Sequence, residues 1–366
     1  MEETKLICAE CGTELTLDTA FEFNGEYYCE DCLDDLTVIC DHCNTRIFRE
    51  YANIDSNYTL CQECYYEHYT CCEDCGRIIA NEDCYYIDEY DDYPYCYGCY
   101  QQVQKYKGIH DYDYKPDPIF HGNGNRFFGV ELEVDCGGHI DDNAREVLEI
   151  ANDNQEENLY IKHDGSLEDG FELVTHPMTL DYHKNIMPWK KIMERLIKLG
   201  YTSHKTTTCG LHCHINRSAF GDTYEEQEEV IARILYFVEH HWAEMLRFSR
   251  RTEGQMQRWA ARYGIKSKPK ELMDDAKNNN YSRYRCINIQ NYNTIEFRMF
   301  RGTLKYNTFI ATLQLVNEIC NVAVFMSDDE IQSLTWLDFV KGLNTSEHNE
   351  LITYLKERNI YESEAE

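Results

Sequence analysis

Paired cysteines at constant spacing constrain this chain more than any other feature. In its N-terminal third, Cys-x-x-Cys pairs combine two by two across gaps of 17, 17 and 20 residues, and the first two units recur with a period of 32. Their cysteines are Cys8, Cys11, Cys29 and Cys32, then Cys40, Cys43, Cys61 and Cys64, then Cys72, Cys75, Cys96 and Cys99. The turn formed by one Cys-x-x-Cys pair offers two thiolates to a tetrahedral ion, and the turn of a second, distant pair completes the site. We therefore predict three zinc modules in residues 1–107, holding about three Zn2+ per chain.

The cysteine count supports metal rather than disulfides. The chain has 19 cysteines, of which 14 fall in the first 100 residues. Its acidic start lacks the apolar stretch of a secretory signal, so we expect a cytoplasmic protein. Each unit is too short to bury much of a core, so zinc must supply its folding free energy. Cys71 and Cys84 lie outside the pairs and are interpreted as bystanders or alternates rather than ligands. The units resemble LIM-like treble-clef or zinc-ribbon fingers, although a LIM pair usually includes histidine and a shorter gap.

The net charge of -31 limits the partners of the chain. A general nucleic-acid binder would have to offset phosphate charge, and an anionic membrane surface would repel this protein in the same way. Residues 1–115 carry 26 acidic and 7 basic side chains, and each zinc tetrathiolate adds negative charge. This balance favours docking of a protein or peptide by the zinc modules, with a purely structural spacer as the alternative.

Beyond the cysteine array the pattern predicts an α+β domain. Residues 108–126 are rich in Pro, Gly and Asn and are interpreted as a linker, followed by a main domain at 127–326 and a helical extension at 327–366. We expect strands at about 127–135, 158–163, 170–175, 210–216, 284–290 and 294–300. We expect helices near 141–153, 181–199, 223–250 and 306–326, and one or two short helices after Trp336. No run of 18 apolar residues occurs, so we expect no transmembrane helix.

Three of the expected strands alternate apolar residues with a pair of ionisable residues. The pairs are Glu131 and Glu133, His212 and His214, and Glu296 and Arg298. Side chains at i and i+2 lie on the same face of a strand. A single strand of this kind is usually an amphipathic edge whose charges lie in water. Three in one domain predict a shared surface of carboxylates, imidazoles and a guanidinium.

Such a surface favours a nucleotide–metal site. Carboxylates with one imidazole suit Mg2+ or Mn2+, which bridge nucleotide phosphates. Arg298, with Arg301, would bind phosphate oxygens. A hydrolytic zinc site is disfavoured because the sequence has no His-Glu-x-x-His helix, and it has no phosphate-binding P-loop either.

Four segments of this domain resemble the motif series of the amidoligases, relatives of glutamine synthetase and of the carboxylate–amine ligases. They are FGVELEVD (128–135), KHDGSLEDGFELVTHP (162–177), CGLHCHIN (209–216) and RCINIQNYNTIEFRMFRGT (285–303). The resemblance covers about 127–326. It implies a glutamine-synthetase-like curved antiparallel sheet that holds ATP and two or more Mg2+ ions. It also implies that a carboxylate substrate becomes an acyl phosphate, which an amine converts to an amide.

The same resemblance assigns roles by position in the motifs. One metal would be held by Glu131, His212 or His214, and Glu296, and a second by Glu133 and Glu172. Nucleotide contacts would come from Arg298, Arg301 and Lys162. Asp164, in an Asp-Gly-Ser turn, is a candidate group near the amine, with a turn-forming role as the alternative.

A basic stretch stands out in this acidic chain, and several alternatives remain open. It comprises Arg247, Arg250, Arg251, Arg258, Arg262, Lys266, Lys268 and Lys270. It is interpreted either as a solvated, salt-bridged face or as a lid that contacts phosphate or an acidic substrate. The alternatives to a ligase are a phosphotransferase on the same sheet and a noncatalytic zinc-finger adaptor. The sequence does not decide between a small-molecule and a protein substrate, or the oligomeric state.

Overall fold

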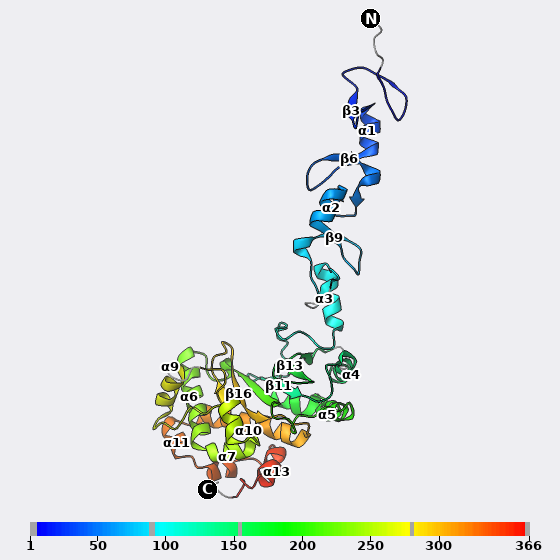
Figure 1. Cartoon of the computed structure of the whole chain (residues 1–366). Coiled ribbons are helices and arrows are strands. Elements are labelled where there is room, and N and C mark those ends of the chain that lie inside the picture. The colour runs from blue at the N-terminus through cyan, green and yellow to red at the C-terminus, as the bar shows by residue number, and fades with distance from the viewer. Residues whose placement is uncertain (1–5, 88–91, 153–155, 279–281, 363–366) are drawn as a thin grey trace. The chain divides into compact units, whose positions relative to one another are not determined.

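The chain folds as two units, Met1–Tyr106 and Lys107–Glu366 (Figure 1). The structure is a computed structural model, and it describes residues 6–87, 92–152, 156–278 and 282–362.

The first unit repeats one small motif three times. Each repeat begins with a hairpin that carries the first cysteine pair, and the second pair begins a short helix. The first two repeats contain β1 (Leu6–Ile7), β2 (Glu14–Leu15), β3 (Phe21–Phe23), β4 (Glu26–Tyr28) and α1 (Glu30–Leu36), then β5 (Thr37–Ile39), β6 (Arg46–Phe48), β7 (Asn53–Ile54), β8 (Thr59–Leu60) and α2 (Gln62–His68). The third contains β9 (Tyr69–Cys71), β10 (Ile78–Ala80) and α3 (Tyr97–Tyr106). After each first pair the chain turns through a left-handed residue, namely Gly12, Asn44 or Gly76, which glycine and asparagine tolerate best.

The twelve predicted ligands gather in the three predicted quartets. In each quartet the four sulfur atoms lie within 4.8 Å of one another. The sulfurs of Cys8 and Cys29 are 3.8 Å apart, and those of Cys43 and Cys61 are 3.9 Å apart. A tetrahedron with Zn–S bonds of about 2.3 Å has edges of about 3.8 Å. The quartets therefore fit tetrahedral zinc, and neither Cys71 nor Cys84 belongs to one.

Neighbouring modules share their small cores. The helix α1 ends at Leu36 and β5 starts at the next residue, so no linker separates the first two modules. Phe48 of the second module packs against Phe23 of the first, with ring centroids 5.0 Å apart. Ile78 of the third module likewise joins the core around Leu60 of the second. Because residues of the next repeat complete each core, the modules form one structural unit rather than independent domains.

The second unit is built on a six-stranded antiparallel sheet with the order β12-β13-β11-β14-β16-β15. Its strands are β11 (Phe128–Val134), β12 (Leu159–Lys162), β13 (Phe171–Thr175), β14 (Gly210–Asn216), β15 (Ile287–Asn288) and β16 (Thr294–Arg301). Every strand pair is antiparallel. The α+β class and the antiparallel sheet are thus confirmed, while the closer likeness to glutamine synthetase stays a prediction.

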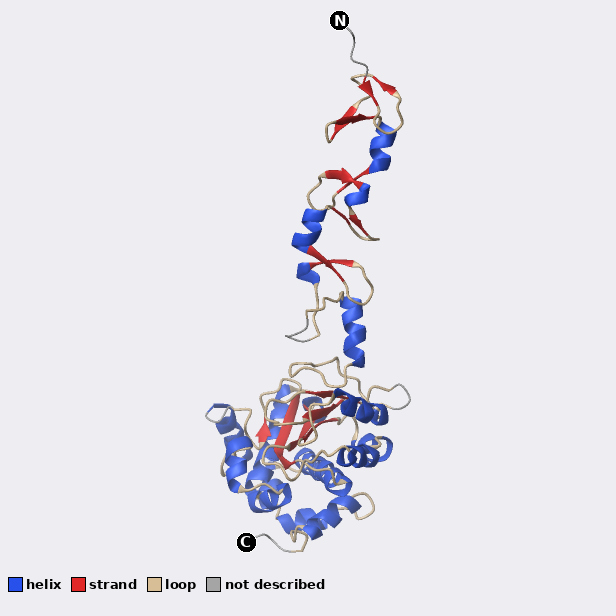
Figure 2. Ribbon diagram, turned by 45° about the vertical axis from the view of Figure 1, so that its right-hand side comes forward, coloured by secondary structure: helices blue, strands red, loops and turns tan. Residues whose placement is uncertain are grey.

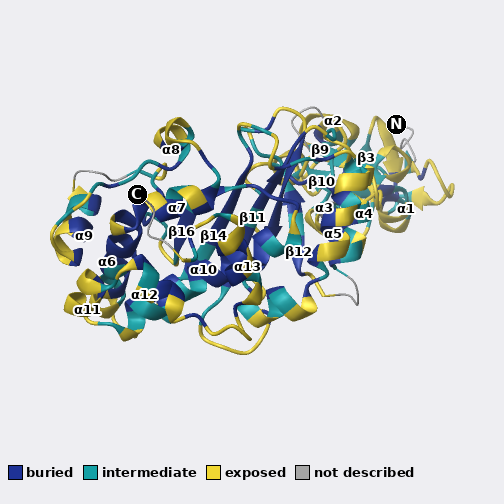
Figure 3. Ribbon diagram, turned by 90° about the horizontal axis from the view of Figure 1, so that it is seen from below, coloured by how far each residue is buried: buried dark blue, intermediate teal, exposed yellow. Residues whose placement is uncertain are grey.

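One face of the sheet forms the core of this unit. The apolar positions of the three central strands are fully buried, as Val130, Leu132, Cys213, Ile295 and Phe297 show. Figure 2 shows helices around this sheet, and in Figure 3 its strands are mostly buried while α9 and α11 carry many exposed residues. These helices are α4 (Asp141–Ala151), α5 (Trp189–Lys198), α6 (Tyr224–His240), α7 (Trp242–Ser249), α8 (Glu253–Trp259), α9 (Pro269–Asn278), α10 (Tyr306–Phe325), α11 (Asp328–Ser333), α12 (Trp336–Lys341) and α13 (Asn349–Glu357). The alternation read from the sequence therefore buries the apolar side chains and leaves the ionisable ones on the other face.

Two predicted helices are interrupted. The segment 181–199 is a π-helical turn, Tyr182–Ile186, followed by α5, because Pro188 has no N–H to continue the helix. The segment 223–250 divides into α6 and α7 at His241, and Arg250 ends α7 in the left-handed conformation. The basic stretch contains α8 and the start of α9, and neither helix was predicted. The strand expected at 284–290 is a strand only at Ile287–Asn288, and Arg285 forms an isolated bridge with Ala261.

The segments at both ends of the predicted domain pack onto it. In the expected linker, Ile109 is buried and His110 pairs with Lys162 of β12. In the C-terminal extension, α13 lies against α10, and Leu351 N donates to Gln314 Oε1 at 2.8 Å. Among the described residues, α10 alone is long and apolar enough to cross a membrane, but 67% of that window is buried inside the unit. That burial is what a core helix requires.

Candidate functional site

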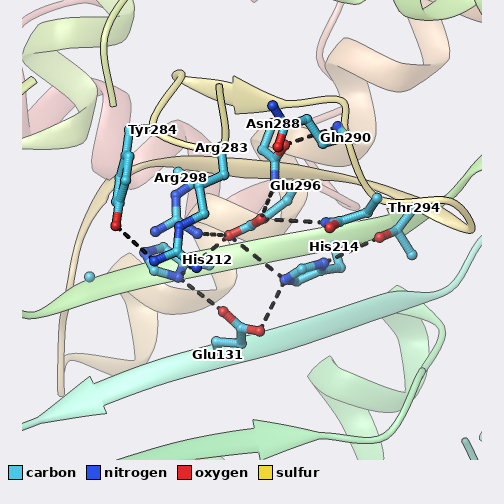
Figure 4. Close-up of polar contacts among 12 residues, drawn as sticks. Glu131, His212, His214, Arg283, Tyr284, Asn288, Gln290, Thr294, Glu296 and Arg298 are labelled. Atoms are coloured by element: carbon cyan, nitrogen blue, oxygen red, sulfur yellow. Dashed lines mark hydrogen bonds and ion pairs between the residues drawn. The ribbon is translucent and has the colours of Figure 1, made fainter. Parts of the chain in front are cut away.

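The register of the sheet brings the predicted ionisable pairs together. Glu131 on β11 lies opposite His212 on β14, and His214 lies opposite Glu296 on β16. His212 Nδ1 lies 3.0 Å from Glu131 Oε2 and 3.7 Å from Glu296 Oε1. His214 Nε2 lies 3.2 Å from Glu131 Oε1 and 3.9 Å from Glu296 Oε1. Figure 4 shows these side chains pointing toward one another from three adjacent strands.

Ligand atoms of Glu131, His212 and Glu296 lie close enough to share one ion, all within 4.8 Å of one another. Glu296 is 3% exposed. Its Oε2 accepts a hydrogen bond from Asn288 Nδ2 at 2.9 Å, and its Oε1 contacts Arg298 Nη1. These two donors, with a longer contact from Asn291 Nδ2 at 3.5 Å, fix the orientation of a carboxylate that is buried on the sheet.

A second group adjoins the first and shares His212 with it. Glu133 on β11 lies directly opposite Glu172 on β13, and ligand atoms of these two residues and of His212 lie within 4.8 Å. His212 Nε2 lies 3.8 Å from Glu133 Oε1, so its two ring nitrogens face different groups. Glu133 Oε2 accepts from the backbone N of Gly210 at 2.5 Å. Lys162 Nζ lies 3.5 Å from Glu172 Oε2.

The two groups differ in their electrostatics. Burial alone would raise the pKa of Glu131, but His214 and His212 hold that pKa well below its usual range. Burial likewise opposes the lowered pKa of Glu296, which His214 and His212 cause. In the second group burial raises the pKa of Glu133, and burial together with Glu131 raises the pKa of Glu172. The second group is therefore an acidic pair short of positive charge, which a cation would supply.

The remaining predicted residues lie at different distances from these groups. Arg298 reaches Glu296, whereas Arg301 Nη2 donates to Thr206 O at 3.1 Å, and no ion pair links it to a carboxylate within the described ranges. Asp164 Oδ1 accepts from the backbone N of Ser166 at 2.7 Å, which is the turn-forming role given as its alternative. The charge of Asp164 also acts on Glu133, so it lies near the second group.

Sequence reasoning missed two contributors. Asn288 was quoted only within a motif, yet it holds Glu296 in place. Arg251 was read as part of an exposed basic stretch or lid, yet it is 7% exposed and its charge acts on Glu133. For Asn288, the available signal was its short separation from Glu296 in the sequence, which suits two strands joined by a tight turn. The folding-back of Arg251 onto the sheet has no local sequence signal.

The fold and the site define a class: an α+β protein whose antiparallel sheet carries two adjoining, carboxylate-rich groups fit for divalent cations. Residues 140–320 match the model of a protein family described as "Putative amidoligase enzyme". The family assignment made from the sequence motifs is confirmed over this segment, and it supports a ligase-type function. The matched residues include His212, His214 and Glu296, while Glu131 and Glu133 precede them.

Other comparisons add little. A search of curated proteins finds no match to this chain. Among solved structures, a bifunctional glutathione synthetase from Pasteurella multocida is similar at a TM-score of 0.36 and 12% sequence identity. The similarity covers 65% of this chain and 47% of that one, so this chain spans about half the length of the synthetase.

Proposed function

We propose that the second unit is an ATP- and Mg2+-dependent amidoligase, which joins a carboxylate to an amine through an acyl phosphate. The observation that carries the proposal is the pair of adjoining groups on one sheet face that share His212. The family assignment supports the same reaction class.

The donors present fit divalent cations. Glu131 and Glu296 would hold one ion, and Glu133 and Glu172 would hold another. Since a neutral imidazole has one free lone pair, His212 would ligate one of these ions and orient a carboxylate of the other group through its N–H, with His214 beside the first group. Carboxylate oxygens with one imidazole are suited to Mg2+ or Mn2+. Glu133 and Glu172 are buried and lie opposite each other on the adjacent strands β11 and β13. Burying two carboxylates so close together costs free energy unless a cation lies between them. When bound, these ions would neutralise phosphate oxygens and draw charge from the γ-phosphorus.

The proposed reaction has two steps. In the first, a carboxylate oxygen of the substrate attacks the γ-phosphorus of ATP, the bond from phosphorus to the ADP oxygen breaks, and ADP leaves. In the second, the amine nitrogen attacks the acyl carbon, the bond from carbon to the phosphate oxygen breaks, and inorganic phosphate leaves. The amine nitrogen loses a proton to give the amide.

The side chains of this chain would position the reactants. Arg298, oriented by its contact with Glu296, would bind γ-phosphate oxygens and stabilise charge as the phosphoryl group moves. Lys162, which lies beside Glu172, would also contact the nucleotide phosphates. Asp164, whose charge acts on Glu133, would receive the amine proton in addition to its turn contact with Ser166.

The zinc modules would recruit a protein or peptide that bears one of the reacting groups. Their surface is acidic, and it exposes tyrosines such as Tyr51, Tyr66 and Tyr97. Tyrosine offers a large contact area together with a hydrogen-bonding hydroxyl, and it is enriched at interfaces. An acidic, tyrosine-bearing surface suits docking of a basic segment.

The test compares Glu131→Gln and Glu296→Gln with the exposed control Glu149→Gln on α4. Both site variants should abolish ATP turnover while zinc content and fold are retained, and the control should turn over at the wild-type rate. Hydroxylamine should trap the acyl phosphate as a hydroxamate. Unchanged turnover in both site variants would remove the proposed site. A phosphorylated product without any hydroxamate would favour the phosphotransferase.

A further inference from the structure

A cavity lined by arginines lies beside α7 in the second unit. Its volume is about 700 Å3, and its basic lining consists of Arg247, Arg250, Arg251, Arg301, Arg358 and His204. Glu253 is the one acid among its lining residues. Five guanidinium groups around one cavity are unexpected in a chain with a net charge of -31.

Backbone carbonyls orient these guanidinium groups without neutralising them. Arg250 Nη2 donates to Arg301 O at 2.5 Å, and Arg358 Nε donates to Arg247 O at 2.9 Å. Arg251 Nη2 donates to Phe300 O at 3.3 Å. Within the described parts of the chain, no ion pair joins any of the five arginines to a carboxylate. The cavity therefore has preorganised positive charge that no ion pair among the described residues neutralises.

Two of these arginines keep unused donors in the interior. Arg251 is 7% exposed, and its Nε is buried with no hydrogen-bond partner among the described residues. The Nε of Arg301 is buried and unpartnered in the same way. The pKa of Arg251 is lowered to about 10, chiefly by burial and also by Arg298 and Arg301, against the opposing effect of Glu133. A buried guanidinium without an anion is costly, so an anionic ligand would relieve it.

The cavity adjoins the second carboxylate group. A Cβ placed on Gly210 would meet His212 Nε2 at 2.6 Å and Arg251 Nη2 at 3.0 Å, so both side chains crowd the same glycine. The backbone N of that glycine donates to Glu133. A ligand held by Arg251 is therefore next to the group formed by Glu133, Glu172 and His212.

We propose that this arginine-lined cavity binds the carboxylate substrate of the ligase, and that this substrate is an oligocarboxylate such as a short run of acidic residues. The inference rests on the proposed function, because it names the substrate of the same site. One carboxylate would be held next to Glu133 and His212, where it reacts. The others would form charge-assisted, two-point contacts with the remaining guanidinium groups. A single carboxylate would leave most of the five charges unpaired.

Arginine also binds phosphate, so the competing occupant is the triphosphate of the nucleotide. Direct binding separates the two sources. The probe is a fluorescent tetraglutamate peptide, with tetraglutamine as its neutral match, added to the full-length, zinc-loaded chain without nucleotide. Tetraglutamate should bind, tetraglutamine should not, and an excess of Mg-ATP should leave tetraglutamate bound.

Variants at the cavity rim test the site without disturbing the core. The double change Arg247→Gln and Arg358→Gln should weaken tetraglutamate binding by roughly tenfold or more, since each loses a charge-assisted contact. Glu253→Gln should strengthen it, because it removes the one acid of the lining. Arg145→Gln, on α4 away from the lining, should leave binding unchanged.

The outcomes are distinct from those of the ligase test, since no catalytic step is needed for binding. Absent tetraglutamate binding, or equal binding in all variants, would overturn the proposal even if Glu131→Gln abolishes ATP turnover. Displacement by Mg-ATP, with nucleotide affinity falling in the rim variants, would assign the cavity to the triphosphate instead. Intact peptide binding in a chain that lacks ATP turnover would overturn the ligase and leave an anion-binding domain.

Discussion

His212 Nδ1 lies 3.0 Å from Oε2 of Glu131, the residue directly across from it on the neighbouring strand. The other ring nitrogen of His212 faces Glu133 at 3.8 Å. One imidazole thus stands between the two carboxylate groups, whereas His214 faces only the first. The sequence alone left these two histidines equivalent, and the sheet register distinguishes them.

The first prediction follows from this asymmetry. His212→Gln should impair both cation sites and reduce ATP turnover to background. His214→Gln should affect one site and raise the Mg2+ concentration needed for half-maximal turnover by roughly 10–100-fold, as expected for residues that support a ligand set. A titration of turnover against Mg2+ measures both. Equal effects of the two variants would contradict the central position of His212.

The second prediction concerns Asn288, which donates to Glu296 Oε2 at 2.9 Å. Asn288→Ala should release this carboxylate and raise the half-maximal Mg2+ concentration by roughly 10–100-fold. Asn291 reaches the same oxygen at 3.5 Å and serves as the matched control, so Asn291→Ala should have a much smaller effect. A similar shift in both variants would contradict the particular role of Asn288, and no shift in either variant would mean that Glu296 is held in place mainly by Arg298.

Local signals account for most of what the sequence could predict. The i, i+2 pairs on β11, β14 and β16 follow from the strand period, and the cysteine spacing follows from the coordination geometry of zinc. The strand register, and the way a distant segment packs back onto the sheet, have no such local signal. Arg251 was expected to be solvated because its neighbours are basic. The turn at Arg250 instead lets the side chain of Arg251 donate to the carbonyl of Phe300 on β16. The break at His241 was hidden because apolar residues continue through α6 and α7 with one helical period.

The third prediction concerns zinc. The zinc-loaded chain should contain about three Zn2+, and Cys75→Ser should lower this to about two. Cys71→Ser is the matched control, because Cys71 is exposed and belongs to no quartet, so its zinc content should stay at about three. Elemental analysis of the purified variants gives the count. A loss of zinc in Cys71→Ser equal to that in Cys75→Ser would contradict the quartet assignment.

Removal of zinc should act on the first unit alone. Because the module cores are small and shared between neighbours, a strong chelator should make residues 6–87 sensitive to protease. The second unit has its own core, so its fragment should survive the same digestion. Digestion of both units at the same chelator concentration would contradict the separate stability of the second unit.

The last prediction is a pH dependence in the second unit. His348 Nε2 lies 3.1 Å from Glu318 Oε1, which joins the start of α13 to α10. The hydrogen bond to Glu318 raises the pKa of His348 above its ordinary 6.5, despite the opposing effect of burial. Burial would raise the pKa of Glu318, but its hydrogen bond with His348 lowers it below 4.5.

The sign of the effect follows from these two directions. The contribution of His348 is complete below pH 6.5 and is lost as the pH rises through its raised folded-state pKa. The contribution of Glu318 is present above pH 4.5 and is lost as the pH falls through its lowered folded-state pKa. His348→Gln should therefore reduce the free energy of unfolding by about 1 kcal/mol between these limits and by less in alkaline solution. Urea unfolding of the second unit at pH 5.5 and pH 8.5, in the wild type and in His348→Gln, measures this difference in the free energy of unfolding. A difference between the two proteins that is larger at pH 8.5 than at pH 5.5 would contradict the ion pair.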